Sequence, residues 1–283
     1  MVGVDSSHAE HFLGHLNVEA RYPGHRVTAI CGADPARTGA LASTFGVNDT
    51  TRTPASLVAV VDAVIVGDRD GRLHLDNALP ALEAGLPVLI DKPLACSLAD
   101  AEILLGTARR TGAKLLSASA VRWQPDVDRL RRRINRLGGA ERLVVSGGFD
   151  VDSPYGGLWF YGVHTMELAL ELAGAGIEEL AIDAANRLLT RVSCRVGSIE
   201  VQLLFTRLGP EESASFTAEA VGARGQAQQT IRLGRAYMAP VLDRFIAMLG
   251  GAPPPLSDAD LLAPVRVLAA LEAALTTSGP RRR

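Results

Sequence analysis

The chain has 283 residues, is 47% hydrophobic and 21% charged, and carries a formal net charge of −2. This length predicts about two domains with a large apolar core, and the composition excludes wholesale disorder. The balanced charge excludes a strongly basic nucleic-acid-binding protein, and no apolar run reaches the roughly 18–20 residues of a membrane-spanning helix.

The first 120 residues alternate short apolar strands with helices. Ser7 is expected to cap the first helix, and Gly46 to end the second. Unbroken apolar strands with short connections predict a doubly wound parallel sheet, that is, an α/β fold. The predicted strands cover residues 2–4, 26–31, 60–66, 88–90 and 114–119, and the helices begin near His8, at Asp34-Pro35, at Leu75 and after Ser97.

Two features bear on the cellular compartment. The chain opens with Val2-Gly3-Val4, the tail of a strand, so we expect no signal peptide and a first strand shorter than the typical five to six or so residues. The cysteines, Cys31, Cys96 and Cys194, are odd in number and far apart, which predicts neither a disulfide framework nor a metal cluster and indicates a reducing cytoplasm. Basic runs occur at 131–133, expected to be a solvated helix face, and at 281–283.

Residues 121–283 have a different pattern, in which strands follow one another. Such a run predicts an α+β domain built on an antiparallel sheet. The alternation of apolar and polar residues over 198–206 predicts one buried sheet face. Strands are predicted over 141–148, 188–196, 198–206, 215–221 and 227–233, and helices over 125–135, 164–172, 238–249 and 257–277.

The stretch Val88-Leu89-Ile90-Asp91-Lys92-Pro93 carries the strongest chemical signal. Its apolar run predicts a buried strand, which Pro93 must end. Ligands of open α/β sheets bind beyond the carboxyl ends of the strands, so Lys92 stands where a catalytic lysine is expected. The alternative is a lysine in an ordinary surface loop.

Several motifs, taken in order, resemble the Gfo/Idh/MocA oxidoreductases. They are DAVIVG with His74 seven residues after Gly67, ALEAGLPVLIDKPLA, SASAVRWQPDVDRL, YGVHTMELALELAG and PVLDRFIAMLGGAPPPLSDADLLAPVRVLAALEAA. The resemblance implies a Rossmann NAD(P)-binding domain over residues 1–120 and an α+β domain with a mainly antiparallel open sheet over 121–283. It also implies that this sheet joins copies into a homodimer or homotetramer. Whether the last helices pack back on the first domain stays open.

The resemblance further implies an NAD(P)-dependent oxidoreductase acting on a sugar, cyclitol or similar polyol or ketone. Lys92 would contact the nicotinamide ribose and the reacting hydroxyl, and its peptide bond to Pro93 is expected to be cis. His164 has an intrinsic pKa of about 6.5, which suits an acid/base; the alternative is a core histidine on an apolar helix. The other residues that the resemblance assigns to the cofactor are Gly67, His74, Asp91, Pro93 and Arg122.

The phosphate-binding loop departs from the family pattern. The Gly-x-Gly-x-x-Gly fingerprint falls on Gly3, Asp5 and His8, so only its first glycine is present. Asp5 adds bulk and negative charge where the backbone normally approaches the pyrophosphate. Asp5-Ser6-Ser7-His8 is expected to offer backbone N–H groups and hydroxyls instead, and the alternative is an ordinary strand–helix turn.

The segment around the catalytic histidine departs as well. The aspartate that the family usually has four residues before the histidine is Phe160 here. We expect Tyr161, a candidate catalytic residue, or Glu167 to orient His164; alternatively the proton relay is rewired. Residues expected to line the substrate pocket are Trp123, Trp159, Tyr161, His164 and Glu167, with core aromatics as the alternative for the rings.

The cofactor choice depends on the end of the second strand. Asp34 would bind the ribose 2′-OH of NAD, whereas the nearby Arg37 would favour the 2′-phosphate of NADP. Asp34 also suits a helix N-cap, because it precedes Pro35. We favour NAD over NADP.

Three functional hypotheses follow from these residues. The first is a cytoplasmic NAD(P)-dependent dehydrogenase of a carbohydrate-like alcohol, without nucleic-acid or membrane partners. The second is a catalytically impaired relative that senses a ligand or acts as a scaffold, favoured by Phe160 and the altered loop. The third is an enzyme that uses tightly bound NAD in a transient oxidation, which would release no net NADH.

Overall fold

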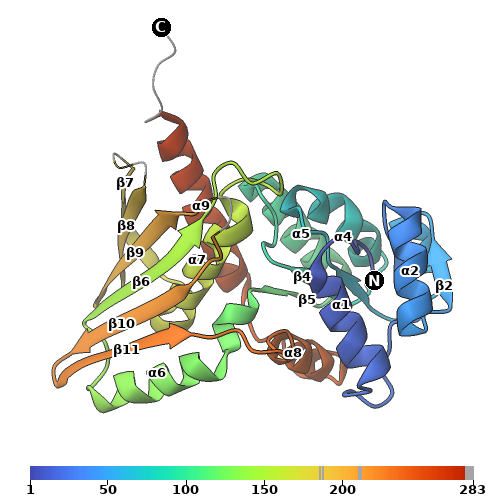
Figure 1. The fold of residues 1–283 in the computed structure, drawn as a ribbon, viewed down its shortest axis with the longest axis horizontal. Coiled ribbons are helices and arrows are strands. Elements are labelled where there is room, and N and C mark those ends of the chain that lie inside the picture. The colour runs from blue at the N-terminus through green and yellow to red at the C-terminus, as the bar shows by residue number, and fades with distance from the viewer. Residues whose placement is uncertain (185, 187, 210–211, 278–283) are drawn as a thin grey trace, which may run out of the picture. The chain divides into compact units, whose positions relative to one another are not determined.

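Figure 1 shows the chain as a computed structural model, which describes residues 1–184, 186, 188–209 and 212–277. The first of its two compact units combines Met1–Ala118 with Met238–Ser257, and the second combines Ser119–Tyr237 with helix α9 (Asp258–Thr277). The predicted domain division at residues 120 and 121 stays a prediction, and the basic run 281–283 lies outside the described residues. Among the described residues, no helix has the length and hydropathy needed to cross a membrane.

The sheet of the first unit is built from parallel pairs. Its strands are β1 (Ala29–Cys31), β2 (Asp49–Thr51), β3 (Val64–Val66), β4 (Val88–Asp91) and β5 (Leu115–Ala118). β1 pairs with β2, and β3, β4 and β5 pair in that order. Val2 forms parallel bridges to both Cys31 and Val66, which places it between β1 and β3. The order β2-β1-Val2-β3-β4-β5 is that of a doubly wound Rossmann sheet and confirms the predicted fold class.

Helices accompany these strands, and some of them begin at a residue whose side chain caps the helix. They are α1 (Ser7–Leu13), the π-helix η1 (Gly14–Val18), α2 (Pro35–Phe45), α3 (Pro54–Val58), the 3-10 helix η2 (Gly71–Leu73), α4 (His74–Glu83), α5 (Leu98–Thr111) and, from later in the chain, α8 (Ala239–Leu249). Asp34 and Ser97 cap α2 and α5 through their side chains, as predicted. The predicted cap of α1 was wrong by one residue, because Ser6 occupies the N-cap position and Ser7 begins the helix.

The first strand is short, as expected, yet it is paired on both sides. The N–H of Cys31 donates to Met1 O (2.9 Å), and the N–H of Val2 donates to Ile65 O (2.8 Å). The predicted strand over 60–66 was wrong about its start. β3 begins only at Val64, because Val60 lies in a turn after α3 that leaves its side chain 56% exposed.

A buried carboxylate ties α1 to β4. His8 Nδ1 lies 2.6 Å from Asp91 Oδ2, and Asp91 is only 4% exposed. Burial by itself raises the pKa of Asp91, but the charge of His8 and its hydrogen bond, together with Lys92 and His74, outweigh burial and lower that pKa to about 2. Asp91 is therefore ionised in the folded protein at neutral pH.

The second unit is built on a six-stranded mixed sheet. Its strands are β6 (Arg142–Phe149), β7 (Ile177–Asp183), β8 (Leu189–Val196), β9 (Ile199–Arg207), β10 (Phe216–Gly222) and β11 (Gly225–Ile231). The order is β11-β10-β6-β9-β8-β7, and every neighbouring pair is antiparallel except β6 with β9. The mainly antiparallel sheet was predicted. β7 was missed, because this edge strand has an irregular register and no buried face that a sequence pattern could reveal.

One face of this sheet is covered by α7 (Trp159–Ala173), against which α9 packs (Figure 1). The alternation in β9 buries Val201, Leu203 and Phe205, as predicted. α7 lies so close to β6 that a Cβ on Gly147 would sit 2.0 Å from Thr165 Oγ1, so a side chain cannot replace this glycine. The amphipathic α6 (Pro125–Arg136) packs along β11. Association of copies through the opposite face stays a prediction.

The substitution Asp91→Asn removes the carboxylate charge while keeping the side chain's shape. The pKa of Asp91 is about 2 in the folded state and ordinarily 3.8. At pH values above 3.8 this difference stabilises the folded protein by roughly 2 kcal/mol. We expect D91N to lower the free energy of unfolding by about 2 kcal/mol at pH 7, as measured by urea unfolding.

The pH dependence separates this cause from a packing defect. The stability difference between the wild type and D91N should shrink as the pH falls from the ordinary pKa of 3.8 towards the folded-state value of about 2. Asp62→Asn, at an exposed position of the same unit, is the matched control and should leave stability nearly unchanged. A difference between wild type and D91N that is independent of pH would contradict the prediction.

Candidate active site

The predicted cofactor residues of the first unit gather at the carboxyl ends of its strands. The segments concerned are Gly3–His8 after Val2, residues 67–70 after β3, and residues 91–93 at the end of β4. Side chains join them: the Ser6 hydroxyl donates to Gly67 O (2.9 Å), and the N–H of Arg69 donates to Asp5 Oδ1 (3.0 Å). Together with the His8–Asp91 pair, these bonds assemble the edge at which open α/β sheets bind ligands.

Gly3 and Asp5 explain how the loop forms without the full glycine fingerprint. Gly3 has φ +74°, and a Cβ at this position would lie 2.3 Å from Asp68 Cγ, so both conformation and space require glycine. The expectation that the Asp5 carboxylate simply faces the anion needs a correction. This carboxylate accepts a hydrogen bond from the backbone N–H of Arg69, which lies in the loop after β3. The hydrogen bond partly compensates the negative charge of Asp5.

Lys92 is a buried amine at the end of β4. It is 4% exposed, and burial lowers its pKa while the neighbouring Asp91 opposes that shift. The Lys92–Pro93 peptide bond is cis, as expected. The alternative of an ordinary solvated loop lysine is wrong, because such a side chain would be exposed and its pKa would not be lowered by burial.

His74 braces the two loops around Lys92. The ring is fully buried, with Nδ1 2.7 Å from Pro93 O and Nε2 3.1 Å from Asp68 O. A neutral imidazole can donate to one of these carbonyl groups and the protonated ring to both. Asp68, which the sequence analysis did not single out, is buried too, and its carboxylate accepts from Asn77 (2.8 Å) while burial raises its pKa. Direct binding of the cofactor by His74 stays a prediction.

Asp34 and Arg37 follow β1 and have different hydrogen-bond partners. Asp34 Oδ1 accepts the backbone N–H groups of Ala36 (2.9 Å) and Arg37 (3.3 Å), so the predicted capping role is confirmed. The Arg37 guanidinium donates to Val4 O and Ser6 O and pairs with Glu10 (3.0 Å). Arg37 thus holds the Gly3–His8 loop in place.

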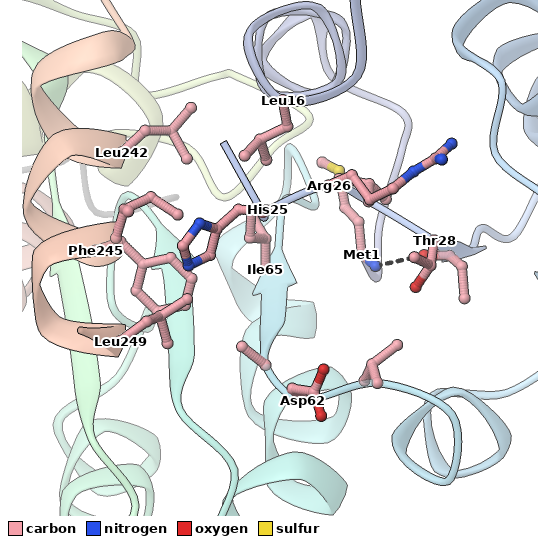
Figure 2. Close-up of a pocket in the computed structure, with 16 residues that line it drawn as sticks. Met1, Leu16, His25, Arg26, Thr28, Asp62, Ile65, Leu242, Phe245 and Leu249 are labelled. Atoms are coloured by element: carbon pink, nitrogen blue, oxygen red, sulfur yellow. Dashed lines mark hydrogen bonds between the residues drawn. The ribbon is translucent and has the colours of Figure 1, made fainter. Parts of the chain in front are cut away.

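A separate cavity of about 200 Å³ in the first unit lies at the opposite ends of the strands (Figure 2). It is lined by residues just before β1 and β3 and by apolar side chains such as Leu16, Ile65 and Phe245. This is the amino-terminal side of the sheet, where Rossmann folds do not bind their ligands. Among the described residues, no group of three or more His, Cys, Asp or Glu could hold a metal ion.

In the second unit, His164 on α7 has a partner that the sequence analysis missed. Its Nδ1 lies 2.6 Å from the hydroxyl of Ser119, which also accepts the N–H of Val121 (3.1 Å) and so caps the 3-10 helix η3 (Ala120–Trp123). The Tyr161 ring lies 6.4 Å from the His164 ring between centroids. Ser119 ends the strand predicted over 114–119, and a polar residue at a strand's carboxyl end is the one signal that could have revealed it.

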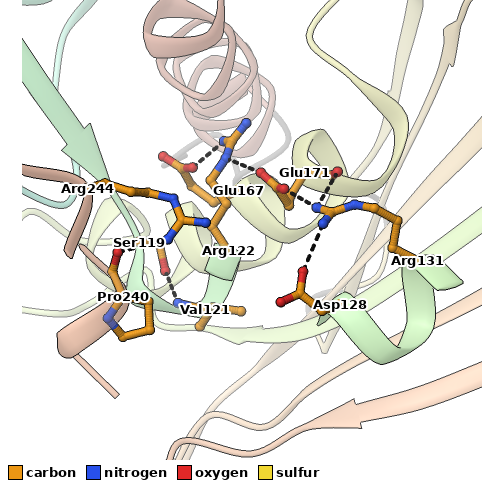
Figure 3. Close-up of polar contacts among 9 residues, drawn as sticks. All are labelled: Ser119, Val121, Arg122, Asp128, Arg131, Glu167, Glu171, Pro240 and Arg244. Atoms are coloured by element: carbon orange, nitrogen blue, oxygen red, sulfur yellow. Dashed lines mark hydrogen bonds and ion pairs between the residues drawn. The ribbon is translucent and has the colours of Figure 1, made fainter. Parts of the chain in front are cut away.

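Glu167 does not orient His164, contrary to one expectation. It accepts from Arg122 at 2.5 Å, and Arg122 also pairs with Glu171 (2.8 Å) (Figure 3). Burial raises the pKa of Glu167, and the Arg122 charge opposes this shift. Arg131 extends the network from α6 to Glu171. The Arg122 guanidinium is buried between two carboxylates, and its contact with the cofactor stays a prediction.

The aromatic residues divide into core and cleft. Trp159 is 1% exposed, and its indole N–H donates to Glu272 (3.1 Å), so it is a core side chain rather than a wall of the substrate pocket. Trp123 is buried as well. Tyr161 and Phe160 are half-buried and line an open cleft of the second unit.

Comparison with known proteins bears on the family and the fold. A family model described as "Oxidoreductase family, NAD-binding Rossmann fold" matches residues 1–119. D-apiose dehydrogenase of Paraburkholderia graminis is 27% identical over 86% of this chain and 70% of its own length. Inositol 2-dehydrogenase of Corynebacterium glutamicum is 29% identical over 52% of this chain, and the match spans 43% of that relative.

The fold is shared over nearly the whole length with solved structures. The scyllo-inositol dehydrogenase of Lactobacillus casei, solved with bound NAD(H) and scyllo-inositol, superposes with a TM-score of 0.81 at 14% identity, covering 98% of this chain and 96% of that one. At this identity the likeness shows the fold alone. Residues 1–119 thus match the model of this oxidoreductase family, and the motifs at Asp91-Lys92-Pro93 and His164 resemble those of the Gfo/Idh/MocA oxidoreductases.

Proposed function

We propose that this protein is an NAD-dependent dehydrogenase that transfers a hydride between nicotinamide and the CH–OH carbon of a sugar, cyclitol or similar polyol, in the cytoplasm. The observation that carries the proposal is the buried Lys92, which directly follows β4 at the edge assembled by Gly3, Asp5 and Ser6. The family match and the names of the relatives, which are dehydrogenases, support an oxidoreductase that acts on CH–OH groups.

The edge of the first unit fits a dinucleotide. Gly3 lets the backbone turn tightly, and the exposed Ser7 begins α1, where N–H groups suit a pyrophosphate. Asp34 uses Oδ1 for both capping bonds, and its Oδ2 would bind a ribose hydroxyl. A 2′-phosphate would have to draw Arg37 away from Val4, Ser6 and Glu10, so we favour NAD over NADP.

The proposed mechanism separates the proton from the hydride. When bound, the nicotinamide ring accepts or supplies the hydride. His164 takes the hydroxyl proton at Nε2, because Ser119 occupies Nδ1. The Ser119 hydroxyl can donate to Nδ1 of the neutral ring and accept from Nδ1–H of the charged ring, so it holds the ring in both states. Lys92 donates a hydrogen bond to the substrate oxygen and polarises the C–O bond.

A catalytically impaired relative that senses a ligand is the second candidate. Phe160 stands in place of the family's usual aspartate, and the nearby carboxylate of Glu167 is committed to Arg122. This candidate shares the cofactor edge with the first and differs only in turnover.

Calorimetric titration with NAD, NADH, NADP and NADPH tests the cofactor assignment. We expect micromolar binding of NAD and NADH and at least tenfold weaker binding of the phosphorylated pair, since Arg37 is engaged elsewhere. Tighter binding of NADP would contradict the assignment. Binding of NAD without turnover across a panel of polyols would favour the impaired relative.

Lys92→Ala tests the proposed oxygen-polarising amine. We expect a loss of kcat on the order of a hundredfold or more, with NAD still bound, because the reacting oxygen loses its donor. The other lysine of the sequence, Lys114, donates to the carbonyl oxygens of Met248 and Ala252 and provides the matched control. Lys114→Ala should lower the melting temperature but keep kcat. Near-normal turnover of a folded Lys92→Ala variant would refute the role.

Ser119→Ala tests the positioning of His164. We expect kcat to fall about tenfold to a hundredfold, because the ring loses the bond that fixes its orientation, while KM for NAD stays unchanged. Ser119→Thr keeps the hydroxyl and should restore most of kcat. A Ser119→Thr variant as slow as Ser119→Ala, with both variants folded, would show that the hydroxyl does not position His164.

A further inference from the structure

A cleft of about 1070 Å³ opens in the second unit at the ends of β6 and β9 and the start of α7. Pockets that enclose a drug-sized ligand measure roughly 300–1,000 Å³, so this cleft exceeds what one sugar ring needs. Tyr161 lines the cleft and also contacts the His164 ring. The cleft therefore begins beside the proposed acid/base.

Three aromatic rings run from His164 into this cleft. The Tyr161 and Phe160 rings lie 4.7 Å apart, and the Phe160 and Tyr155 rings 5.4 Å apart, between centroids. All three side chains are half-buried, so each packs on its neighbour and still presents surface to the cleft. Such a row offers stacking surface to a flat ligand face that carries C–H groups.

The charges of the cleft restrict which ligand can enter. The carboxylates among its described lining residues belong to Asp150, Asp152 and Glu212, and the guanidinium to Arg207. Arg207 already pairs with Asp152, so it is not aimed at a ligand anion. The described lining is thus acidic, and it disfavours a phosphate or carboxylate group, whereas its carboxylate oxygens can accept hydrogen bonds from hydroxyl groups.

We propose that this cleft is a second-ring subsite, which binds the neighbouring sugar ring of a disaccharide-sized glycoside whose first ring is oxidised. The inference rests on the proposed function and names its substrate class, an uncharged or amino-substituted glycoside rather than a phosphorylated or nucleotide-linked sugar. A pyranose suits the site because its C–H face can stack on either Phe160 or Tyr155, whose rings are tilted by 45° to each other, while its hydroxyls reach the carboxylates at the rim.

The experiment measures sugar binding to the NAD-loaded protein by saturation-transfer NMR and calorimetry, independently of turnover. The probes are the methyl glycosides of glucose, galactose and mannose, disaccharides that contain these sugars, and their 1-phosphates. At least one disaccharide should bind about tenfold more tightly than its methyl glycoside, and the 1-phosphates at least tenfold more weakly. Tyr155→Ala and Phe160→Ala should each remove most of the gain in affinity that the disaccharide has over its methyl glycoside.

The variants and the cofactor separate the possible outcomes. Leu180→Ala, at an exposed position of β7 outside the cleft, is the control and should keep the gain. Equal binding of mono- and disaccharides, a gain that survives both aromatic variants, tighter binding of 1-phosphates, or no binding of any probe overturns the subsite. If NAD binds and a monosaccharide is oxidised in those cases, the proposed dehydrogenase function stands; failure to bind NAD overturns that function itself.

Discussion

A carboxylate and an amine are buried next to each other at the end of β4. The surrounding segments of the first unit supply the hydrogen-bond partners that this burial requires. Asp91 and Lys92 are each 4% exposed. Buried charges are tolerated only when partners replace water. His8 supplies the partner for Asp91, and His74 fixes the Lys92–Pro93 turn through the backbone. The lowered pKa of Lys92 follows from this burial and gives the chain an amine suited to chemistry.

Two parts of the structure differ from the family pattern that the sequence resembles. The missing glycines of the phosphate loop are matched by side-chain bonds from Asp5, Ser6 and Arg37, which fix the loop that a glycine-rich turn would otherwise shape. In the second unit, a serine hydroxyl holds His164 in place of the usual carboxylate. A hydroxyl serves both protonation states of the ring, whereas a carboxylate favours the charged one. The relay would therefore depend less on a fixed negative charge.

In the proposed function, the acidic aromatic cleft of the second unit would extend the site outward from His164. Phe160 replaces the expected aspartate and becomes part of the ring row that reaches from His164 into the cleft. One substitution thus removes a candidate relay group and adds stacking surface. We infer that Phe160, in place of the aspartate, removes a charge from the reacting centre and adds contact with a larger substrate.

The sequence by itself determined the two kinds of sheet, the Asp34 and Ser97 caps and the candidate status of Lys92 and His164. These features depend on local periodicity, turn chemistry and motifs, that is, on residues that are close to one another in the sequence. Tertiary structure alone decided that Ser119 holds His164, that Glu167 and Arg122 neutralise each other, and that Trp159 is a core residue. It also decided the edge strand β7, which has no buried face. Such features depend on which distant side chains meet and on how much water they lose, and neither quantity is written in the spacing of residues along the chain.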